Sequence, residues 1–244
     1  LDDIDTVVHF AAETGTGQSM YAIHHYSNVN IDGTVILLEL IAKNKLPVKK
    51  IVIASSRAVY GEGKYFCREH DFIYPPARLV SNMENGDFDV HCPVCDEIVD
   101  FVPSDETTPV SPSSVYGVTK LTQEQMGLIV GKAIGMSVIA LRFQNVYGPG
   151  QSLSNPYTGI LSIFATRICN GNSINIFEDG KESRDFLFID DAIRATVGAI
   201  DFSPPIFESL NVGSGQPTDI ATIARIMQSS FSTSVPTKIT GQFR

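Results

Sequence analysis

The sequence predicts an α/β fold built around a doubly wound parallel sheet. Short apolar runs at residues 5–10, 50–55 and 137–142 are typical of buried strands. Segments 27–44 and 115–135 carry apolar residues at helical spacing. Strands that alternate with helices in this order indicate a parallel sheet with helices packed on both faces.

The sequence pattern after about residue 150 predicts a smaller C-terminal lobe. The expected elements are helices at 159–170, 190–200 and 219–229 and strands at 174–177, 186–188 and 209–212. We therefore divide the chain into a first domain at residues 1–150 and a lobe at residues 151–244. Residues 61–105 interrupt the first domain with four prolines and three cysteines, so we expect an inserted loop or small lobe there.

The composition indicates a globular protein with an acidic surface, with 244 residues and a formal net charge of −9. An acidic surface repels phosphate, which argues against binding to nucleic acid or to an anionic membrane. No apolar run is long enough to span a bilayer, and the acidic residues at 2–5 do not resemble the basic start of a signal peptide. We expect a cytoplasmic protein.

Tyr116 and Lys120 form the first candidate site, within the predicted helix 115–135. Residues four apart on a helix share one face, with side-chain roots about 5–6 Å apart. An ammonium group beside a phenol lowers the pKa of the tyrosine, as a general base near neutral pH requires. This spacing also occurs by chance, so an ordinary surface pair is the alternative.

Ser55 and Ser56 end the predicted strand 50–55 and begin the turn after it. In open α/β sheets, ligands bind outside the carboxyl ends of the strands. A serine hydroxyl at this place can hydrogen-bond a reacting alcohol or carbonyl and share its proton with Tyr116. The alternative is a turn that merely ends the strand.

Further motifs follow in an order that resembles one enzyme family. The segments are His9–Ala12, Asn30–Thr34, Arg142–Pro149, Arg184–Asp191 and Asn211–Gly215. Together with the two serines and the Tyr-x-x-x-Lys helix, they resemble the extended short-chain dehydrogenases/reductases, the NAD-dependent epimerase/dehydratase family. This resemblance implies a Rossmann-like sheet that binds NAD and a C-terminal lobe that binds a nucleotide sugar.

The resemblance also implies a role for each matching residue. The implied catalytic set is Ser56, Tyr116 and Lys120; the NAD contacts are Phe10, Ala11, Ala12, Asn30, Ser55, Tyr116 and Lys120; the substrate contacts are Ser56, Asn145 and Arg184. Tyr116 would be the base, and Lys120 would hold the nicotinamide ribose. A guanidinium suits the substrate pyrophosphate because its fork matches phosphate oxygens. An ion pair of Arg184 with Asp185 or Asp191 is the alternative.

The chain departs from the family pattern at its start. The family carries a Gly-x-x-Gly-x-x-Gly turn upstream of the position of His9, and this sequence has no such stretch. Those glycines allow the backbone to approach the cofactor pyrophosphate at a helix N-terminus. We therefore expect a partial NAD-binding domain that lacks its first strands, and name no glycine-rich cofactor residues.

The residues after Ser56 narrow the reaction that the resemblance implies. Arg57 and Ala58 stand where the family's sugar 4,6-dehydratases typically carry an Asp-Glu pair, so the acid for dehydration is missing. The remaining expectation is 4-epimerisation through a 4-keto sugar. The insert resembles that of the 4-epimerases acting on dTDP-L-rhamnose, and the alternatives are a UDP-hexose 4-epimerase and an NAD(P)-dependent nucleotide-sugar reductase. The family also implies a homodimer formed through two helices, one of which carries Tyr116.

The insert contains a candidate metal site with the spacing of a zinc ribbon. Cys67-x-x-His70 is followed after twenty-one residues by Cys92-x-x-Cys95. Thiolates and imidazole suit tetrahedral Zn²⁺, and four protein ligands make a closed structural site. His91 is a rival fourth ligand, and free thiols in a loop are the alternative. A metal would stabilise a lobe too small to build its own core.

Two other functional classes fit less well. A non-catalytic protein on this fold typically loses the tyrosine or the lysine, and both Tyr116 and Lys120 are present. A nucleic-acid-binding finger in the insert requires a basic surface, whereas residues 57–105 carry many acidic side chains.

Overall fold

The computed structural model describes residues 3–153 and 159–243. The chain forms two compact units. The first unit comprises residues 1–63, 104–144 and 190–212, and the second comprises residues 64–103, 145–189 and 213–244. Each unit is described below by itself.

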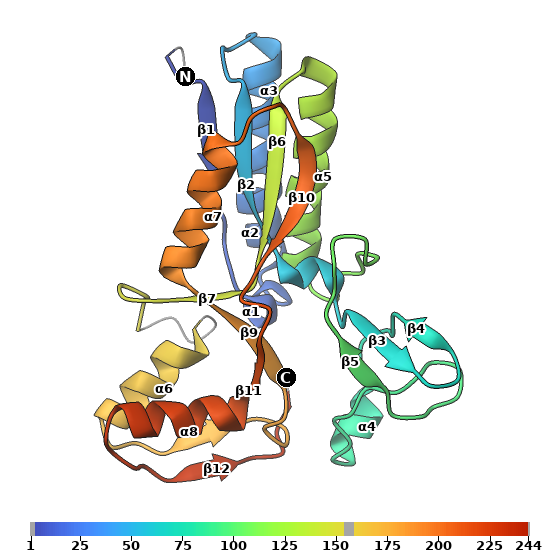
Figure 1. Ribbon diagram of the computed structural model, residues 1–244, viewed down its shortest axis with the longest axis vertical. Helices are drawn as coiled ribbons and strands as arrows, with labels where there is room; N and C mark the ends of the chain where they lie inside the picture. Colours follow the sequence, from blue (N-terminus) through green and yellow to red (C-terminus); the bar gives the residue numbers. More distant parts are fainter. Residues whose placement is uncertain (1–2, 154–158, 244) are drawn as a thin grey trace. The chain divides into compact units, whose positions relative to one another are not determined.

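The first unit contains a four-stranded sheet in the order β1-β2-β6-β10 (Figure 1). The strands are β1 (Thr6–His9), β2 (Lys50–Ser56), β6 (Ser137–Phe143) and β10 (Phe207–Val212). All neighbouring strands are parallel, and Ile53 pairs with His9 on one side and Ala140 on the other. The predicted parallel sheet is confirmed.

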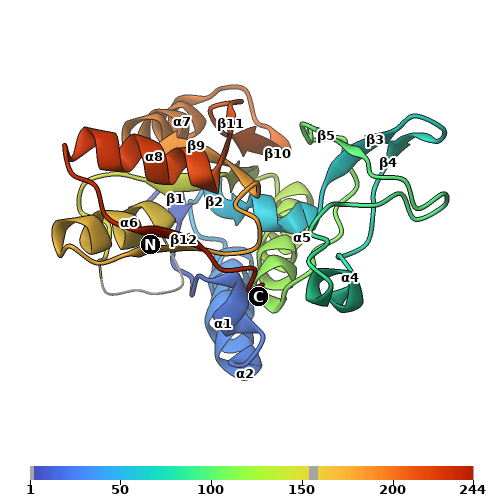
Figure 2. The same cartoon turned by 90° about the horizontal axis from the view of Figure 1, so that it is seen from below.

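Helices cover both faces of this sheet, as the alternation of buried residues requires. The helices are α3 (Gly33–Lys43), α5 (Val115–Ile134) and α7 (Ile189–Asp201). Ile51 and Ile53 pack in a cluster with Leu38 and Ile41 of α3, whereas Val52 packs with Ala199 of α7. Successive side chains of a strand point to opposite faces, so α3 and α7 lie on opposite sides of β2, as Figures 1 and 2 show.

The segment between β1 and α3 contains helical turns, although its sequence pattern predicts neither a helix nor a strand. Two short helices, α1 (Thr16–Ser19) and α2 (Ile23–Tyr26), lead through a π-helical segment, Ser27–Asp32, into α3. Tyr26 is completely buried, and its hydroxyl donates to Thr14 O at 2.6 Å. This buried contact fixes a Gly- and Thr-rich stretch whose pattern alone predicts only a loop.

The second unit consists of small sheets and short helices. Its strands are β3 (Lys64–Cys67), β4 (Asp71–Ile73), β5 (Asp100–Val102), β7 (Asn145–Tyr147), β8 (Ile174–Ile176), β9 (Ser183–Phe188), β11 (Pro217–Asp219) and β12 (Thr237–Ile239). They form the sheets β4-β3-β5, β11-β9-β7 and β12-β8. The helices are α4 (Val80–Glu84), α6 (Ile160–Cys169) and α8 (Ile220–Ser230). Phe164, Ile176 and Ile223 belong to its main core.

The two units differ from the linear division at residue 150. Residues 190–212 return to the first unit because β10 completes its sheet beside β6 and α7 covers one face. Residues 64–103 of the insert group with the second unit. A division read along the sequence cannot foresee a late strand that pairs with an early sheet. Within the described part of the chain, no helix is long and apolar enough to cross a membrane.

Candidate active site

Ser55 and Ser56 are the last two residues of β2, at the carboxyl edge of the parallel sheet. Ser55 is buried, and its hydroxyl donates to Glu124 Oε2 at 2.8 Å. Ser56 Oγ accepts the Ala58 N–H at 3.2 Å and so caps the 3-10 turn Arg57–Tyr60. Ser55 is thus tied into the interior, while Ser56 stands at the start of the turn.

The N-terminus of α5 lies directly against this turn. The Ser114 hydroxyl caps the helix by accepting the Gly117 N–H at 3.1 Å. A Cβ on Gly117 would lie 2.6 Å from Ala58 O, closer than any real Cβ contact, so only glycine permits this approach. Ser19 Oγ accepts the Tyr116 N–H at 3.0 Å. These contacts hold the backbone of Tyr116 beside Ser56.

The Ser56 hydroxyl lies close enough to the Tyr116 phenol to influence its ionisation. Burial raises the pKa of Tyr116, while the Ser56 hydroxyl and the nearby Arg57 guanidinium act in the opposite direction. The expected lowering of the Tyr116 pKa is therefore not found in the protein alone. Desolvation of the phenolate outweighs both favourable contacts.

Lys120 follows Tyr116 by four residues on the same face of α5, and its side chain is buried. Its Nζ donates to Ala54 O at 2.8 Å and lies 6.0 Å from the centre of the Tyr116 ring. Burial lowers the pKa of Lys120 to about 8. The structure thus brings Ser56, Tyr116 and Lys120 together, as the sequence predicts, with the ammonium bonded to a backbone carbonyl.

The residues expected at the cofactor follow β1, the neighbour of β2. Phe10 is 45% exposed and packs edge-to-face on Phe143 at 5.8 Å, with Ala11 and Ala12 next in the chain. Asn30 is completely buried; its Oδ1 accepts the Glu13 N–H at 2.7 Å and its Nδ2 donates to Glu13 O and Thr119 Oγ1. Asn30 therefore holds the loop after β1 in place, and a direct contact with a cofactor stays a prediction.

Sequence reasoning missed a buried polar network behind the two serines. Glu124 on α5 accepts from Ser55 and forms an ion pair with Arg142 on β6. Arg142 Nη1 donates to Tyr60 Oη at 2.7 Å, and that hydroxyl donates to Asn211 Oδ1 at 2.8 Å. The network joins β2, β6, β10 and α5. Arg142 and Asn211 each begin a recognised motif, which is the signal that could have revealed it.

Asn145 and Arg184 lie in the second unit on the neighbouring parallel strands β7 and β9. Asn145 pairs with Phe186, so alternation places Arg184 on the same face as Asn145. Arg184 forms an ion pair with Glu182 and donates to Ser183 O at 2.9 Å. The two predicted substrate contacts thus share one face of a small sheet.

The alternative ion pairs suggested for Arg184 are not those in the structure. Asp185 accepts from the backbone N–H groups of Ser214 and Gly215, each at 2.9 Å, and Asp191 pairs with Arg194 at 2.8 Å. The partly exposed carboxylate of Glu182 pairs with Arg184. A surface ion pair of this kind is weak enough for a ligand phosphate to replace it.

The four predicted metal ligands converge in the insert. The Sγ atoms of Cys67, Cys92 and Cys95 and a ring nitrogen of His70 all lie within 4.8 Å of one another. Cys67 Sγ is 3.5 Å from His70 Nδ1 and 3.6 Å from Cys95 Sγ. His91, the rival ligand, lies outside this cluster because its ring contacts Asp96 O at 2.7 Å and Asp87 Oδ2 at 2.9 Å.

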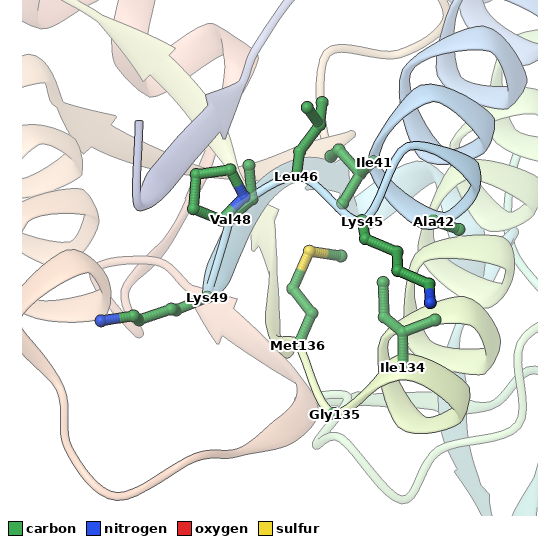
Figure 3. A pocket seen from close by; sticks show the side chains of 10 residues that line it. Ile41, Ala42, Lys45, Leu46, Val48, Lys49, Ile134, Gly135 and Met136 are labelled. Carbon is green, nitrogen blue, oxygen red and sulfur yellow. The ribbon is translucent and has the colours of Figure 1, made fainter. Parts of the chain in front are cut away.

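A pocket of about 570 Å³ lies elsewhere in the first unit (Figure 3). It is lined by the C-terminal ends of α3 and α5 and by the residues before β2 and β6, including Ile41, Leu46, Ile134 and Met136. This is the amino end of the parallel strands, opposite to the edge that holds Ser56. Because α/β sheets bind ligands at their carboxyl ends, we do not assign the active site to this pocket.

The family model of the NAD dependent epimerase/dehydratase family matches residues 1–80 and 93–213. The chain belongs to this family. Among curated proteins, it is 38% identical over 242 residues to the dTDP-L-rhamnose 4-epimerase of Burkholderia thailandensis. That match covers 98% of this chain and 64% of the relative. The chain therefore spans less than two thirds of the length of this relative.

Solved structures of epimerases show the same fold. The UDP-N-acetylglucosamine 4-epimerase of Methanobrevibacter ruminantium, in complex with UDP-N-acetylmuramic acid, has a TM-score of 0.79 at 25% identity, covering 100% of this chain and 66% of that one. The UDP-glucuronic acid 4-epimerase of Bacillus cereus, in complex with UDP-glucuronic acid and NAD, has a TM-score of 0.76 at 25% identity, covering 98% and 63%.

Proposed function

We propose that the protein is an NAD-dependent nucleotide-sugar 4-epimerase. The observation that carries this proposal is the convergence of Ser56, Tyr116 and Lys120 at the carboxyl edge of the sheet, with Tyr116 and Lys120 on one face of α5. The proposal concerns the activity of the whole protein, because this chain covers only 64% of the length of its relative from Burkholderia thailandensis.

Tyr116 is the general base in this proposal. It removes the proton from the sugar C4 hydroxyl, while Ser56 holds that hydroxyl by hydrogen bonding to both partners. NAD bound in the site would supply the hydride acceptor and donor, so that C4 would be oxidised to a 4-keto sugar and reduced again on its opposite face. Tyr116 then gives the proton back to the oxygen, so the reaction has no net redox change.

The residues around Lys120 fit the cofactor. An ammonium group has three N–H donors, and Ala54 O is the one hydrogen-bond acceptor of Lys120 among the described residues. Two donors therefore remain for the hydroxyls of a ribose. Ala11 and Ala12, which follow β1, would form one wall of the cofactor site together with Phe10 and Ser55. A bound positive nicotinamide and Lys120 would together favour the Tyr116 phenolate.

The proposed substrate is dTDP-L-rhamnose. Arg184 and Asn145 would bind its pyrophosphate, because they share one face of the β7–β9 pair and a guanidinium fork matches phosphate oxygens. The relative from Burkholderia thailandensis, a dTDP-L-rhamnose 4-epimerase, supports the choice of rhamnose as the sugar and of thymine as the nucleobase. The UDP-sugars in the solved neighbours favour a UDP-hexose as the second candidate.

We also propose a structural zinc ion in the insert, held by Cys67, His70, Cys92 and Cys95. Tetrahedral bonds of about 2.3 Å to sulfur and 2.0–2.1 Å to nitrogen place ligand atoms about 3.6–3.8 Å apart. The measured separations of 3.5 Å and 3.6 Å fit this geometry. Backbone N–H groups of Cys95 and Val94 help to lower the pKa of Cys92 to about 7, which favours a thiolate ligand. None of the four cysteines forms a disulfide, so the three thiols of the cluster are available to a metal ion.

A homodimer through α3 and α5 completes the proposal. Both helices expose large apolar side chains: Ile36, Leu40, Val118, Ile129 and Ile134 are between 43% and 68% exposed. Water contact with such a group of residues is unfavourable, and a second copy of the chain would cover them. Light scattering of wild type against Ile129→Glu tests this; a monomeric wild type would contradict it.

The test of the function uses the full-length protein with NAD and dTDP-L-rhamnose. NMR should show a dTDP-sugar product inverted at C4, with no accumulation of NADH. Turnover of UDP-galactose alone would contradict the rhamnose assignment. Stoichiometric consumption of a reduced cofactor would indicate a reductase instead.

A further inference from the structure

Within the second unit, an ion pair joins the insert to the turn that precedes β9, the strand that carries Arg184. Arg78, two residues before α4, donates through Nη1 to Glu178 Oε2 at 2.7 Å and through Nη2 to Glu178 Oε1 at 3.0 Å. The side chains are only 21% and 9% exposed. A two-pronged guanidinium–carboxylate contact fixes orientation as well as distance.

On the insert side, Arg78 is tied to the segment that leads into the cysteine cluster. Its Nη1 also donates to Phe88 O at 3.0 Å. Four residues later, Cys92 N donates to Glu97 O at 2.8 Å, and Val99 N donates to Val90 O at 3.0 Å. These bonds form the loop that carries Cys92 and Cys95. The position of Phe88 O, and with it that of Arg78, depends on the folding of this loop.

On the other side, Glu178 begins the turn that leads from β8 into β9. It has a φ of 51°, a left-handed backbone conformation that is strained for a non-glycine residue. Its N–H donates to Gln242 O at 2.8 Å, and Gly180 follows with a φ of 82°. Arg184 lies six residues beyond Glu178. The ion pair therefore holds the turn that sets the start of the Arg184 strand.

The insert has a small core of its own. Its buried cluster consists of Cys67, Ile73, Cys92 and Val99. Two of these residues belong to the proposed metal site, so the insert is expected to unfold when the metal is removed. Unfolding would withdraw Arg78 and leave the Glu178 carboxylate without its guanidinium partner.

We propose that Arg78 is a positioning residue that couples metal binding in the insert to nucleotide-sugar binding at Arg184. The inference rests on the proposed function, because it assumes that Arg184 binds a pyrophosphate. Thermodynamic linkage makes the coupling reciprocal: zinc strengthens nucleotide binding, and nucleotide strengthens zinc binding by the same factor. We expect a factor of about ten, within the usual range for such coupling.

The test measures binding of dTDP to the full-length protein by calorimetry, before and after zinc removal. In the wild type, zinc removal should weaken dTDP binding about tenfold. Arg78→Met should retain one zinc per chain, bind dTDP about tenfold more weakly and show no further effect of zinc removal. In turnover, KM should rise while kcat is unchanged. Arg78→Lys should recover part of the affinity because it keeps the charge.

Two further variants make the outcome decisive. Glu178→Gln removes the same ion pair from the other side and should reproduce Arg78→Met. Arg167→Met is the matched control, since Arg167 is a partly exposed arginine of the same unit whose guanidinium donates to Ser173 O at 2.8 Å. If zinc removal weakened dTDP binding by Arg78→Met and Glu178→Gln as much as it weakens binding by the wild type, the proposed coupling would be overturned. Absence of dTDP binding in the wild type would overturn the proposed function itself.

Discussion

The Tyr116 site and the Cys/His cluster bring distant residues together by different physical means. Ser56 and Tyr116 meet because α5 packs on the sheet through glycines and a large apolar core, in which Ile51, Ile53 and Val138 are completely buried. The cysteine cluster joins residues 67–70 to 92–95 over a core of four buried side chains. The first geometry is a product of packing, whereas the second, in our proposal, depends on a bound metal ion.

The largest expected effect is the loss of the insert fold after removal of its thiolates. Cys92→Ser/Cys95→Ser should abolish zinc binding, because structural zinc contributes on the order of 10 kcal/mol to such lobes. Metal analysis and limited proteolysis within residues 64–103 measure the result. Cys169→Ser is the control, since Cys169 is exposed and lies outside the cluster. Unchanged zinc content in the double variant would refute the site.

Loss of the proposed base should lower the rate of the chemical step and leave the fold of both units intact. Tyr116→Phe should reduce kcat about 10²–10⁴-fold, the range for loss of general acid–base catalysis. Thermal unfolding and zinc content should match the wild type. Tyr21→Phe is a matched control because Tyr21 is 92% exposed. Near-normal turnover by Tyr116→Phe would exclude Tyr116 as the base.

Burial of Lys120, a residue of the first unit, predicts that the free energy of unfolding depends on pH. The pKa of Lys120 is lowered from 10.5 to about 8 in the folded chain. Between these pH values the unfolded state binds more protons, so the free energy of unfolding rises with pH. The total rise is on the order of 3 kcal/mol, at about 1.4 kcal/mol per pKa unit.

Urea unfolding of wild type and Lys120→Met isolates this contribution. The stability difference, wild type minus variant, should increase from about pH 8 to pH 10.5 and be constant below that interval. A pH-independent difference would show that burial does not perturb Lys120.

The smallest expected effect comes from the glycine that allows α5 to approach the turn. Gly117→Ala should lower the free energy of unfolding by about 1–3 kcal/mol, as overpacking does, and should reduce turnover by displacing Ser56. Gly198→Ala in α7 is the control, because its Cβ would meet no atom within 4 Å. That change should stabilise the helix by about 0.5–1 kcal/mol. Equal effects of both substitutions would contradict the packing argument.

The sequence predicts most of the sheet because its strands are continuous apolar runs, and it predicts Ser56, Tyr116 and Lys120 because they lie in compact motifs. The late return of β10 was not predictable, since a strand pattern does not name its partner. The Glu124–Arg142 pair was missed because charged residues on helices and strands are usually exposed. The Arg78–Glu178 pair joins residues 100 apart in sequence, which no local pattern can reveal.

The direction of the pKa shift of Tyr116 was also not predictable from the sequence pattern. Helical spacing places Lys120 near Tyr116, but it does not show that the ammonium donates to Ala54 O or that burial raises the tyrosine pKa. Desolvation depends on the surrounding fold and not on spacing along a helix.

The most direct test of the central claim uses dTDP-L-rhamnose deuterated at C4. The full-length protein is supplied with NAD in ordinary water, and NMR follows both epimers. If Tyr116 takes the hydroxyl proton while the hydride leaves C4 and returns, the C4-inverted product keeps its deuterium. Exchange of that deuterium with solvent, or the absence of a C4-inverted product from any nucleotide sugar, would contradict the account.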